Sequence, residues 1–130
     1  MRLLLDTCIL YDWMMDALAD ADVVALVQDA GAFVSAVSVW EIAIKHALGK
    51  MPLRSRRIVE DIGAQGFGWI NVTPLHAQAV LELPAHHKDP FDRLLIAQAQ
   101  CEGMQILTYD RLFLDYLPNT RLVHSTSPSR

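Results

Sequence analysis

Short apolar runs alternate with amphipathic stretches along the whole chain, and this alternation constrains the fold more than any other feature. Runs such as 2–5, 32–36 and 105–108 have the length and aliphatic content of buried strands, and the segments between them show helical spacing of apolar residues. Strands that alternate with helices form βα units, in which neighbouring strands are parallel. The sequence therefore predicts an α/β protein with a mainly parallel central sheet.

A chain of 130 residues, of which 52% are hydrophobic, has room for one compact domain. A domain of this size buries about two-thirds of its surface on folding. The mean hydropathy of +0.22 excludes a disordered chain, which would be rich in charge and poor in aliphatic residues. We predict a single domain over residues 1–124 and a flexible C-terminal tail over residues 125–130.

Three features favour a cytoplasmic location. Asp6 interrupts the apolar run at the start of the chain, which therefore lacks the pattern of a secretory signal. The longest stretch without charged side chains, residues 62–81, contains glycines, Asn71 and Pro74, so no membrane span is predicted. The two cysteines, Cys8 and Cys101, are too few for a disulfide scaffold or a zinc finger and favour a reducing compartment.

Capping signals divide the chain further. Asp89 followed by Pro90 is a strong helix start, because Asp caps free N–H groups and Pro fits the first turn. Ser38 with Glu41 three residues later predicts a capping box for a helix that ends at Gly49. Helices are predicted over part of 8–15 and over 19–29, 38–49, 55–65, 75–83, 89–102 and 111–116. Strands are predicted over 2–5, 32–36, 68–72, 105–108 and 121–124.

Four carboxylates, which we call the acid cluster, are predicted to meet at one edge of the sheet. Asp6 and Asp110 follow predicted strands, and Glu41 and Asp92 fall in the first turns of predicted helices. In a parallel sheet the helices begin at the edge where the strands end, and ligands bind beyond that edge. Each residue also has a simpler structural interpretation, as a turn cap, as part of the capping box or as a favourable charge near a helix N-terminus.

The charge of the acid cluster predicts a cation. Two carboxylates about 4 Å apart repel each other by roughly 4 kcal/mol at an effective dielectric constant near 20. Capping or a helix dipole contributes about 1 kcal/mol per residue, which does not offset several such repulsions. An all-oxygen ligand set selects Mg²⁺ or Mn²⁺ over softer metals. The chain carries 11 Lys and Arg against 15 Asp and Glu, so the four acids equal its whole net charge of −4.

Four motifs follow one another at characteristic spacing. They are LLLDT (3–7), SAVSVWEI (35–42, followed by Lys45 and Gly49-Lys50), HHKDPFDRLLIAQA (86–99) and LTYD (107–110, with Phe113 beyond it). In this order they resemble the PIN-domain nucleases, and specifically the toxins of VapBC-type toxin–antitoxin pairs. Each motif alone is weak, but together they are specific and cover nearly the whole chain. The resemblance implies a three-layer α/β/α fold with a central, mainly parallel sheet.

The resemblance also implies a metal-dependent endoribonuclease that hydrolyses RNA phosphodiester bonds with water as the nucleophile. Asp6 and Asp92 match the principal Mg²⁺-binding aspartates, with Mn²⁺ as an alternative ion, and Glu41 and Asp110 match the other two catalytic, metal-binding acids. The Thr7 hydroxyl is expected to orient a carboxylate or a metal-bound water, although an ordinary turn hydroxyl explains it equally well. A type II toxin of this kind acts in the cytoplasm, is inhibited by a cognate antitoxin and forms a homodimer.

Basic residues near these motifs are candidates for RNA contacts, which weaken with salt. No acid occurs between Glu41 and Glu60, where the basic residues are Lys45, Lys50, Arg54, Arg56 and Arg57, and Lys88 and Arg93 flank the expected site. A solvated helix face explains the basic segment equally well, and pairing with a carboxylate would explain Arg93. His86 and His87 are adjacent and are expected to point apart, which argues against a zinc site formed by both. They are expected to contact RNA or to line the rim.

Other functions agree less well with the sequence. The non-enzymatic alternative is a catalytically silent PIN-like module that dimerises and binds a partner without cleaving RNA. An aspartate-nucleophile phosphatase needs a second Asp two residues after Asp6, where this chain has Cys8 and PIN relatives commonly carry Asn or His. A receiver domain would carry Lys after a late strand, whereas Arg111 follows Asp110 here. No dinucleotide-binding or P-loop fingerprint occurs.

Overall fold

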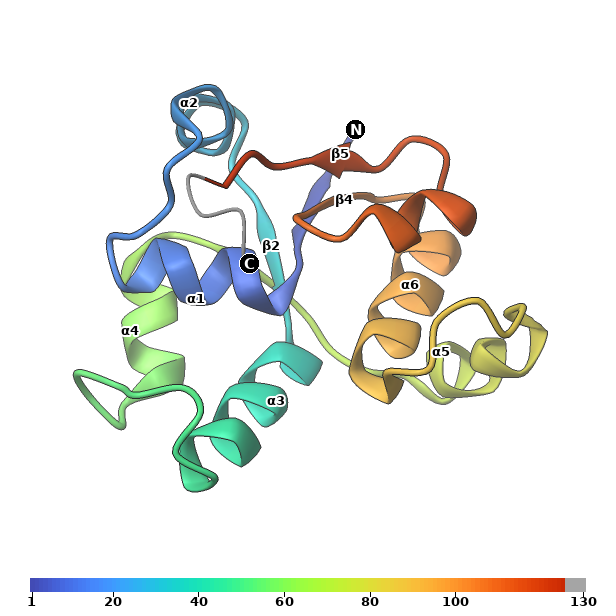
Figure 1. Cartoon of the computed structure of the whole chain (residues 1–130), viewed down its shortest axis with the longest axis horizontal. Coiled ribbons are helices and arrows are strands. Elements are labelled where there is room, and N and C mark those ends of the chain that lie inside the picture. Colours follow the sequence, from blue (N-terminus) through green and yellow to red (C-terminus); the bar gives the residue numbers. More distant parts are fainter. Residues whose placement is uncertain (126–130) are drawn as a thin grey trace.

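The computed structural model describes residues 1–125, so the predicted tail lies, apart from Ser125, outside the described residues. Strands and helices alternate along the chain (Figure 1). The strands are β1 (Leu3–Leu5), β2 (Phe33–Ser35), β3 (Gly68–Ile70), β4 (Gln105–Thr108) and β5 (Arg121–Leu122). The α-helices are α1 (Thr7–Met14), α2 (Ala21–Ala30), α3 (Ala36–Ala47), α4 (Ile58–Ala64), α5 (Pro74–Ala79) and α6 (Pro90–Glu102). Two 3-10 helices are η1 (Val80–Glu82) and η2 (Arg111–Asp115).

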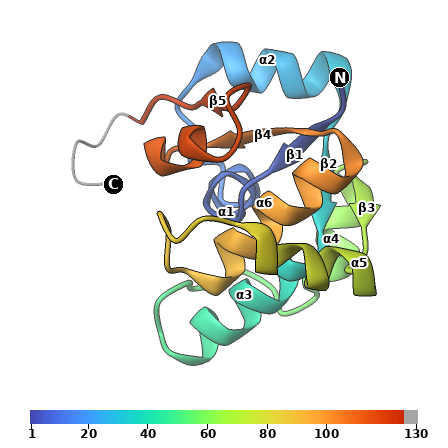
Figure 2. The same ribbon diagram turned by 90° about the vertical axis from the view of Figure 1, so that its right-hand side faces the viewer.

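The strands form one sheet in the order β3-β2-β1-β4-β5, and each pair of neighbours is parallel. The central strand is β1, in which Leu4 lies opposite Phe33 of β2 and Leu5 opposite Leu107 of β4. In Figure 1, α1 and α4 lie on one side of the strands, and α5 and α6 lie on the other. Figure 2 looks onto the side that α5 and α6 cover. The predicted three-layer α/β/α fold with a parallel sheet is confirmed.

Two apolar cores hold the sheet between the helix layers. Leu3 and Leu5 belong to the core covered by α1, α2 and α4, whereas Leu4 belongs to the core beneath α6. Successive strand side chains point to opposite faces, so three consecutive leucines are buried together only where helices cover both faces. Burial of one leucine contributes about 1.5–3 kcal/mol. This run therefore fixes β1, and Asp6 directly after it, at the centre of the fold.

Helix α3 begins at Ala36, directly after β2, so the predicted capping box at Ser38 is wrong. Ser35 is the N-cap: its hydroxyl accepts a hydrogen bond from the Val37 N–H at 3.0 Å and donates one to Gln98 Oε1 at 2.6 Å. Ser35 is preferred as the N-cap because its hydroxyl forms hydrogen bonds both with a free N–H group of the helix and with the buried side-chain amide of Gln98. Glu41 consequently lies in the second turn of α3 rather than in the first.

The basic segment also differs from the prediction, because α4 begins only at Ile58. Arg54, Arg56 and Arg57 precede the helix in an exposed connection, so they do not form the predicted basic helix face. No side chain caps the N-terminus of α4. Within residues 1–125, none of the helices has the length and apolar content to cross a bilayer.

Candidate active site

The structure brings the acid cluster together at the carboxyl edge of the sheet. Asp6 follows β1 and Asp110 follows β4, while α3 and α6 supply Glu41 and Asp92. All four line one cavity of about 510 Å³. The other residues that line this cavity are Cys8, Lys45, Asp89, Tyr109 and Arg111. Four carboxylates from separate parts of the sequence thus converge, because parallel strands end, and the following helices begin, at the same edge of the sheet.

Asp6 is held at the floor of the cavity by two donors. Its Oδ1 accepts a hydrogen bond from the Thr7 N–H at 2.7 Å, and its Oδ2 accepts one from the Thr108 hydroxyl at 2.6 Å. The side chain therefore caps α1 and keeps a fixed orientation. Burial, together with the charges of Glu41 and Asp110, raises the pKa of Asp6 to about 6 against the lowering effect of these hydrogen bonds.

Thr108 is a site residue that sequence reasoning missed. Its hydroxyl accepts a hydrogen bond from the Asp110 N–H at 3.1 Å and donates to Asp6, so it links the segments that carry two of the acids. The available signal was a hydroxyl directly after the apolar pair Ile106 and Leu107 at the end of the strand, two residues before Asp110. Thr108 is fully buried, and a buried hydroxyl needs partners of this kind.

Thr7 contacts Asp6 differently from the prediction. Its backbone N–H orients the carboxylate, whereas its hydroxyl lies 2.9 Å from the hydroxyl of Ser38 on α3. Both side chains are buried, so this pair joins the start of α1 to α3. The Thr7 hydroxyl therefore supports the packing of α1, which Asp6 caps, against α3, which carries Glu41. Within residues 1–125 it makes no hydrogen bond to a carboxylate.

Glu41 is the most deeply buried acid of the cluster, at 2% exposed. Its Oε2 pairs with Lys45 Nζ at 2.5 Å, one turn further along α3. Its Oε1 is buried and has no hydrogen-bond partner among residues 1–125. Burial alone would lower the pKa of Lys45, but the hydrogen bond and charge of Glu41 outweigh it and raise that pKa. Lys45 thus stays charged and neutralises one side of Glu41, while the other oxygen is left for a further partner.

Asp92 lies in the first turn of α6, whose N-cap is Asp89 as predicted. Asp89 Oδ1 accepts hydrogen bonds from the N–H groups of Phe91 at 2.8 Å and Asp92 at 3.1 Å. Burial raises the pKa of Asp92 to about 9, with further contributions from Asp6, Asp89 and the rest of the acid cluster. A carboxyl in this environment retains its proton at neutral pH unless a cation replaces it.

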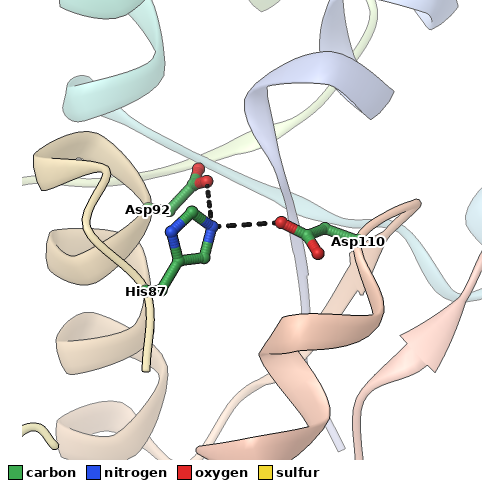
Figure 3. A group of neighbouring side chains, drawn as sticks. All are labelled: His87, Asp92 and Asp110. Carbon is green, nitrogen blue, oxygen red and sulfur yellow. Dashed lines mark hydrogen bonds and ion pairs between the residues drawn. The ribbon is translucent and has the colours of Figure 1, made fainter. Parts of the chain in front are cut away.

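Asp110 and Asp92 share a histidine partner. His87 Nε2 lies 2.9 Å from Asp92 Oδ2 and 3.0 Å from Asp110 Oδ2, and Figure 3 shows the ring between the two carboxylates. The three ligand atoms lie within 4.8 Å of one another. Asp110 also caps η2, because its Oδ1 accepts the Leu112 N–H at 2.9 Å. The expected divergence of the adjacent histidines is confirmed, since His86 packs against Tyr116.

The arrangement favours a hard cation and disfavours a protein nucleophile. Cys8 lines the cavity, but desolvation and the charges of Asp6 and Glu41 raise the pKa of its thiol to about 12. A neutral thiol is a poor nucleophile. Several carboxylates crowd the same space, and two of them have pKa values raised by burial and by one another. Such a cluster is stable in ionised form only with a cation among its oxygens.

The candidate RNA-binding residues fall into three groups. Lys45 and the unpredicted Arg111 line the cavity, and Lys50 and Lys88 are exposed. The pairs Arg54–Asp16 and Arg57–Glu60 are solvent-exposed ion pairs.

Arg93 has a different environment from the one predicted. Its guanidinium donates to the backbone carbonyls of Pro84, His87 and Leu83 at 2.8, 3.1 and 3.1 Å. These bonds use its donors to hold the connection before α6, so pairing with a carboxylate is not observed. Arg93 is therefore better explained as a support for this connection than as a phosphate ligand.

A parallel sheet with an acid-lined cavity at its carboxyl edge defines an α/β protein with a site suited to a divalent cation. The PIN domain model matches residues 3–116, and the chain belongs to the PIN domain family, whose members are nucleases. A search of curated proteins gives no match.

Solved structures share the fold at low sequence identity. A chain of a toxin-antitoxin complex from Klebsiella pneumoniae is 16% identical with a TM-score of 0.66, over 95% of this chain and 99% of that one. A chain of VapBC2 from Rickettsia felis, bound to a promoter DNA fragment, is 15% identical with a TM-score of 0.63, over 94% and 97%. A chain of DNA-bound VapBC from Salmonella typhimurium is 12% identical with a TM-score of 0.60, over 94% and 96%. At these identities the likeness concerns the fold.

Proposed function

We propose that this chain is a metal-dependent endoribonuclease and the toxin of a type II toxin–antitoxin pair. Membership of the PIN domain family and the fold shared with VapBC chains support this proposal. The observation that carries it is the buried Glu41 Oε1, which lacks a hydrogen-bond partner within residues 1–125. Glu41 lines the same cavity as the three other carboxylates of the acid cluster. A buried carboxylate oxygen without a partner is costly, and a cation is the partner that the surrounding negative charge favours.

The donor set fits Mg²⁺ or Mn²⁺. Asp6, Glu41, Asp92 and Asp110 offer only carboxylate oxygens, which hard divalent cations prefer. A cation bound there supplies Lewis acidity and neutralises charge at a phosphate group. In the reaction we propose, a water oxygen bonds to phosphorus, the bond from phosphorus to the 3′ oxygen breaks, and that oxygen takes a proton. The products carry a 5′-phosphate and a 3′-hydroxyl.

The protein groups around the cation site have separate roles in this proposal. Thr7 and Thr108 hold Asp6 in one orientation, so the carboxylate need not reorganise when substrate binds. Lys45 holds one carboxylate oxygen of Glu41, and the other oxygen is buried without a hydrogen-bond partner among residues 1–125. Such preorganised charge is worth more in a water-poor cavity than at the surface.

We propose that RNA phosphates lie along the basic residues at and near the cavity. Lys45 and Arg111 are placed to contact the phosphate nearest the acid cluster, and Lys50 and Lys88 are exposed for outer contacts. Arg54 and Arg57 can exchange their exposed ion pairs for phosphates, because such pairs are worth only about 0–1 kcal/mol. Binding should weaken as salt is raised.

Two protein partners belong to the proposal, namely a cognate antitoxin and a second copy of the chain in a cytoplasmic homodimer. Trp40 and Trp69 support a protein partner, since they are 58% and 37% exposed and line one surface pocket with Val59. Exposed apolar groups gathered in this way are typical of interaction surfaces. Trp69 therefore departs from the packing role that its strand position suggests. Sedimentation analysis of the purified protein tests the dimer.

Cleavage of labelled RNA by the purified protein, with Mg²⁺ added in steps after chelation, tests the nuclease. We expect Mg²⁺-dependent cleavage, which Asp92→Asn abolishes without loss of the fold. Asp115→Asn, an exposed acid on η2 outside the cavity, is the matched control and should cleave normally. Absence of cleavage in the wild-type protein with every cation would leave the silent partner-binding module as the better account.

A further inference from the structure

The connection between η1 and α6 positions His87 in a way that the acid cluster alone does not explain. His86 and His87 are neighbours in the chain, but only His87 turns into the site, with a side chain 13% exposed. Figure 3 shows its ring directed at Asp92 and Asp110, which come from α6 and from the segment after β4. A histidine at this place contacts two acids on separate elements.

Several contacts of different kinds fix His87. Its backbone N–H donates to the Tyr116 hydroxyl at 2.7 Å, and its carbonyl accepts from Arg93 at 3.1 Å. Its ring packs edge-on against Phe113, with centroids 5.9 Å apart and an interplanar angle of 82°. Phe113 is fully buried. The ring is therefore held by the core and by the backbone, and its position does not depend on the two carboxylates alone.

The hydrogen bonds also determine which ring nitrogen carries the proton. The backbone N–H of Asp89 donates to His87 Nδ1 at 3.2 Å, so Nδ1 acts as an acceptor. In a neutral imidazole with an acceptor at Nδ1, the proton is on Nε2. Nε2 is the atom that lies 2.9 and 3.0 Å from the two carboxylate oxygens. His87 Nε2–H thus donates to Asp110 Oδ2, and the same nitrogen lies 2.9 Å from Asp92 Oδ2.

We propose that His87 is a positioning residue of the cation site: its Nε2, which is hydrogen-bonded to Asp110 and lies 2.9 Å from Asp92, sets the spacing of these two carboxyl groups. This inference rests on the proposed function and goes beyond it by assigning a role to a residue outside the acid cluster. An N–H donor between the two carboxyl groups lets them lie close together on separate elements. Direct binding of the cation by Nε2 would require its proton to leave while Nδ1 faces an N–H donor, so we assign His87 as a donor to the ligands.

Two variants of His87 and a control at the neighbouring His86 test whether the N–H donor of His87 supports cation binding. His87→Gln keeps a neutral N–H donor at about the reach of Nε2, whereas His87→Leu removes the donor and keeps an apolar side chain against Phe113. His86→Gln is the matched control, because it changes the adjacent ring outside the site. Measured by calorimetry with Mn²⁺, we expect affinity to fall about 10- to 100-fold in His87→Leu. We expect His87→Gln and His86→Gln to stay within a few-fold of the wild-type protein.

Spectroscopy of the wild-type protein tests the donor assignment even if His87→Leu fails to fold. In metal-free protein at pH 8, long-range proton–nitrogen NMR of labelled histidines should show the Nε2–H tautomer for His87. The Nδ1–H tautomer would overturn the proposal. Electron spin echo spectra of the Mn²⁺-loaded wild-type protein should show no nitrogen coupling from His87. A nitrogen coupling that is present in the wild-type protein and absent in His87→Gln would establish His87 as a direct ligand instead.

The affinity measurement distinguishes failure of this proposal from failure of the proposed function. If the wild-type protein binds neither Mn²⁺ nor Mg²⁺, the metal-dependent function fails, and the role of His87 at a cation site fails with it. If the wild-type protein binds Mn²⁺ and His87→Leu binds it equally well, the function stands and only the positioning role is overturned.

Discussion

Two groups of buried polar side chains differ in how their hydrogen bonds are satisfied. The neutral network consists of Ser35, His76 and Gln98, all at most 2% exposed. Ser35 donates to Gln98 Oε1 at 2.6 Å, Gln98 Nε2 lies 3.4 Å from His76 Nδ1, and His76 Nε2 lies 3.0 Å from Glu102. The acid cluster is also buried in part, but within the described residues its Glu41 Oε1 is the buried side-chain oxygen left without a partner.

This difference separates a structural group from a binding site. The neutral network ties β2, α5 and α6 together and needs nothing from outside, because each donor meets an acceptor. The acid cluster combines like charges, raised pKa values and an oxygen without a partner, and the protein supplies too few donors for it. Substitutions should therefore damage stability in the first group and cation binding or catalysis in the second.

Asp6→Asn in the acid cluster should have a larger effect on cleavage than any substitution outside that cluster. Loss of one cation-binding charge should lower Mg²⁺-dependent cleavage by about 10³-fold, equivalent to about 4 kcal/mol of transition-state stabilisation. The measurement is kcat/KM on labelled RNA, with circular dichroism to confirm the fold. Normal cleavage by a folded Asp6→Asn variant would contradict the assignment of the site.

Gln98→Leu in the neutral network should instead lower the stability of the protein and leave cleavage nearly unchanged. Removal of the amide leaves Ser35 and His76 with lost partners in the core, so the free energy of unfolding should fall by about 3 kcal/mol. Cleavage per folded molecule at low temperature should stay within a few-fold of wild type. Urea denaturation gives the stability, and a variant as stable as the wild type would show that the network is dispensable.

Asp92→Asn should stabilise the metal-free protein. Because the pKa of Asp92 is about 9 in the folded state and near 4 when unfolded, the folded state holds a proton that the unfolded state releases. Stability of the wild-type protein should therefore fall as the pH rises from about 4 toward 9. At pH 8 with chelator we expect Asp92→Asn to be more stable by up to about 5 kcal/mol, at about 1.36 kcal/mol per pH unit above 4, and equally stable at pH 4. A destabilised variant at pH 8 would show that Asp92 is already well compensated.

The same proton competes with the cation, so Mg²⁺ affinity should rise with pH. At pH values below the Asp92 pKa of about 9, each proton that the cation displaces raises the Mg²⁺ affinity by up to tenfold per pH unit, or about 1.4 kcal/mol. Calorimetry between pH 6 and pH 9 measures the slope. Asp92→Asn, if it retains measurable binding, should show a shallower slope. A flat wild-type profile would mean that Asp92 is ionised before the cation arrives.

The smallest effect should come from a surface pair outside both groups. Arg54 and Asp16 form an ion pair in which the side chains are 61% and 85% exposed. Arg54→Gln should change the free energy of unfolding by less than about 0.5 kcal/mol, because water competes for such pairs. Urea denaturation measures this value, and a loss above about 1 kcal/mol would show that the Arg54 bond to the Met15 carbonyl anchors the connection before α4.

The sequence predicted the parallel α/β order and the meeting of the acid cluster because both follow from local patterns. Apolar runs mark the strands, and an acid after a strand must lie at the carboxyl edge. The N-cap of α3 was predicted three residues too late, at Ser38 instead of Ser35, because the two serines are equally good caps in isolation. The choice between them depends on Gln98, which is 63 residues away from Ser35 in the chain.

The residues around the acids were harder to predict. Adjacency shows that His86 and His87 diverge, but it does not show which of them faces the site. That choice depends on Tyr116 and on Arg93, whose side chains hold the connection through its backbone. Thr108 was missed because a threonine in a strand is common, and its bond to Asp6 joins residues 102 positions apart.

The position of β1 between β2 and β4 has a consequence for a chain that is still being synthesised. Asp6 emerges from the ribosome early, but the Thr108 hydroxyl that fixes one of its oxygens, and Asp110 after it, emerge about a hundred residues later. Domains fold as their parts become available during synthesis. A nascent chain that has emerged only as far as α6 therefore lacks the last wall of the cavity.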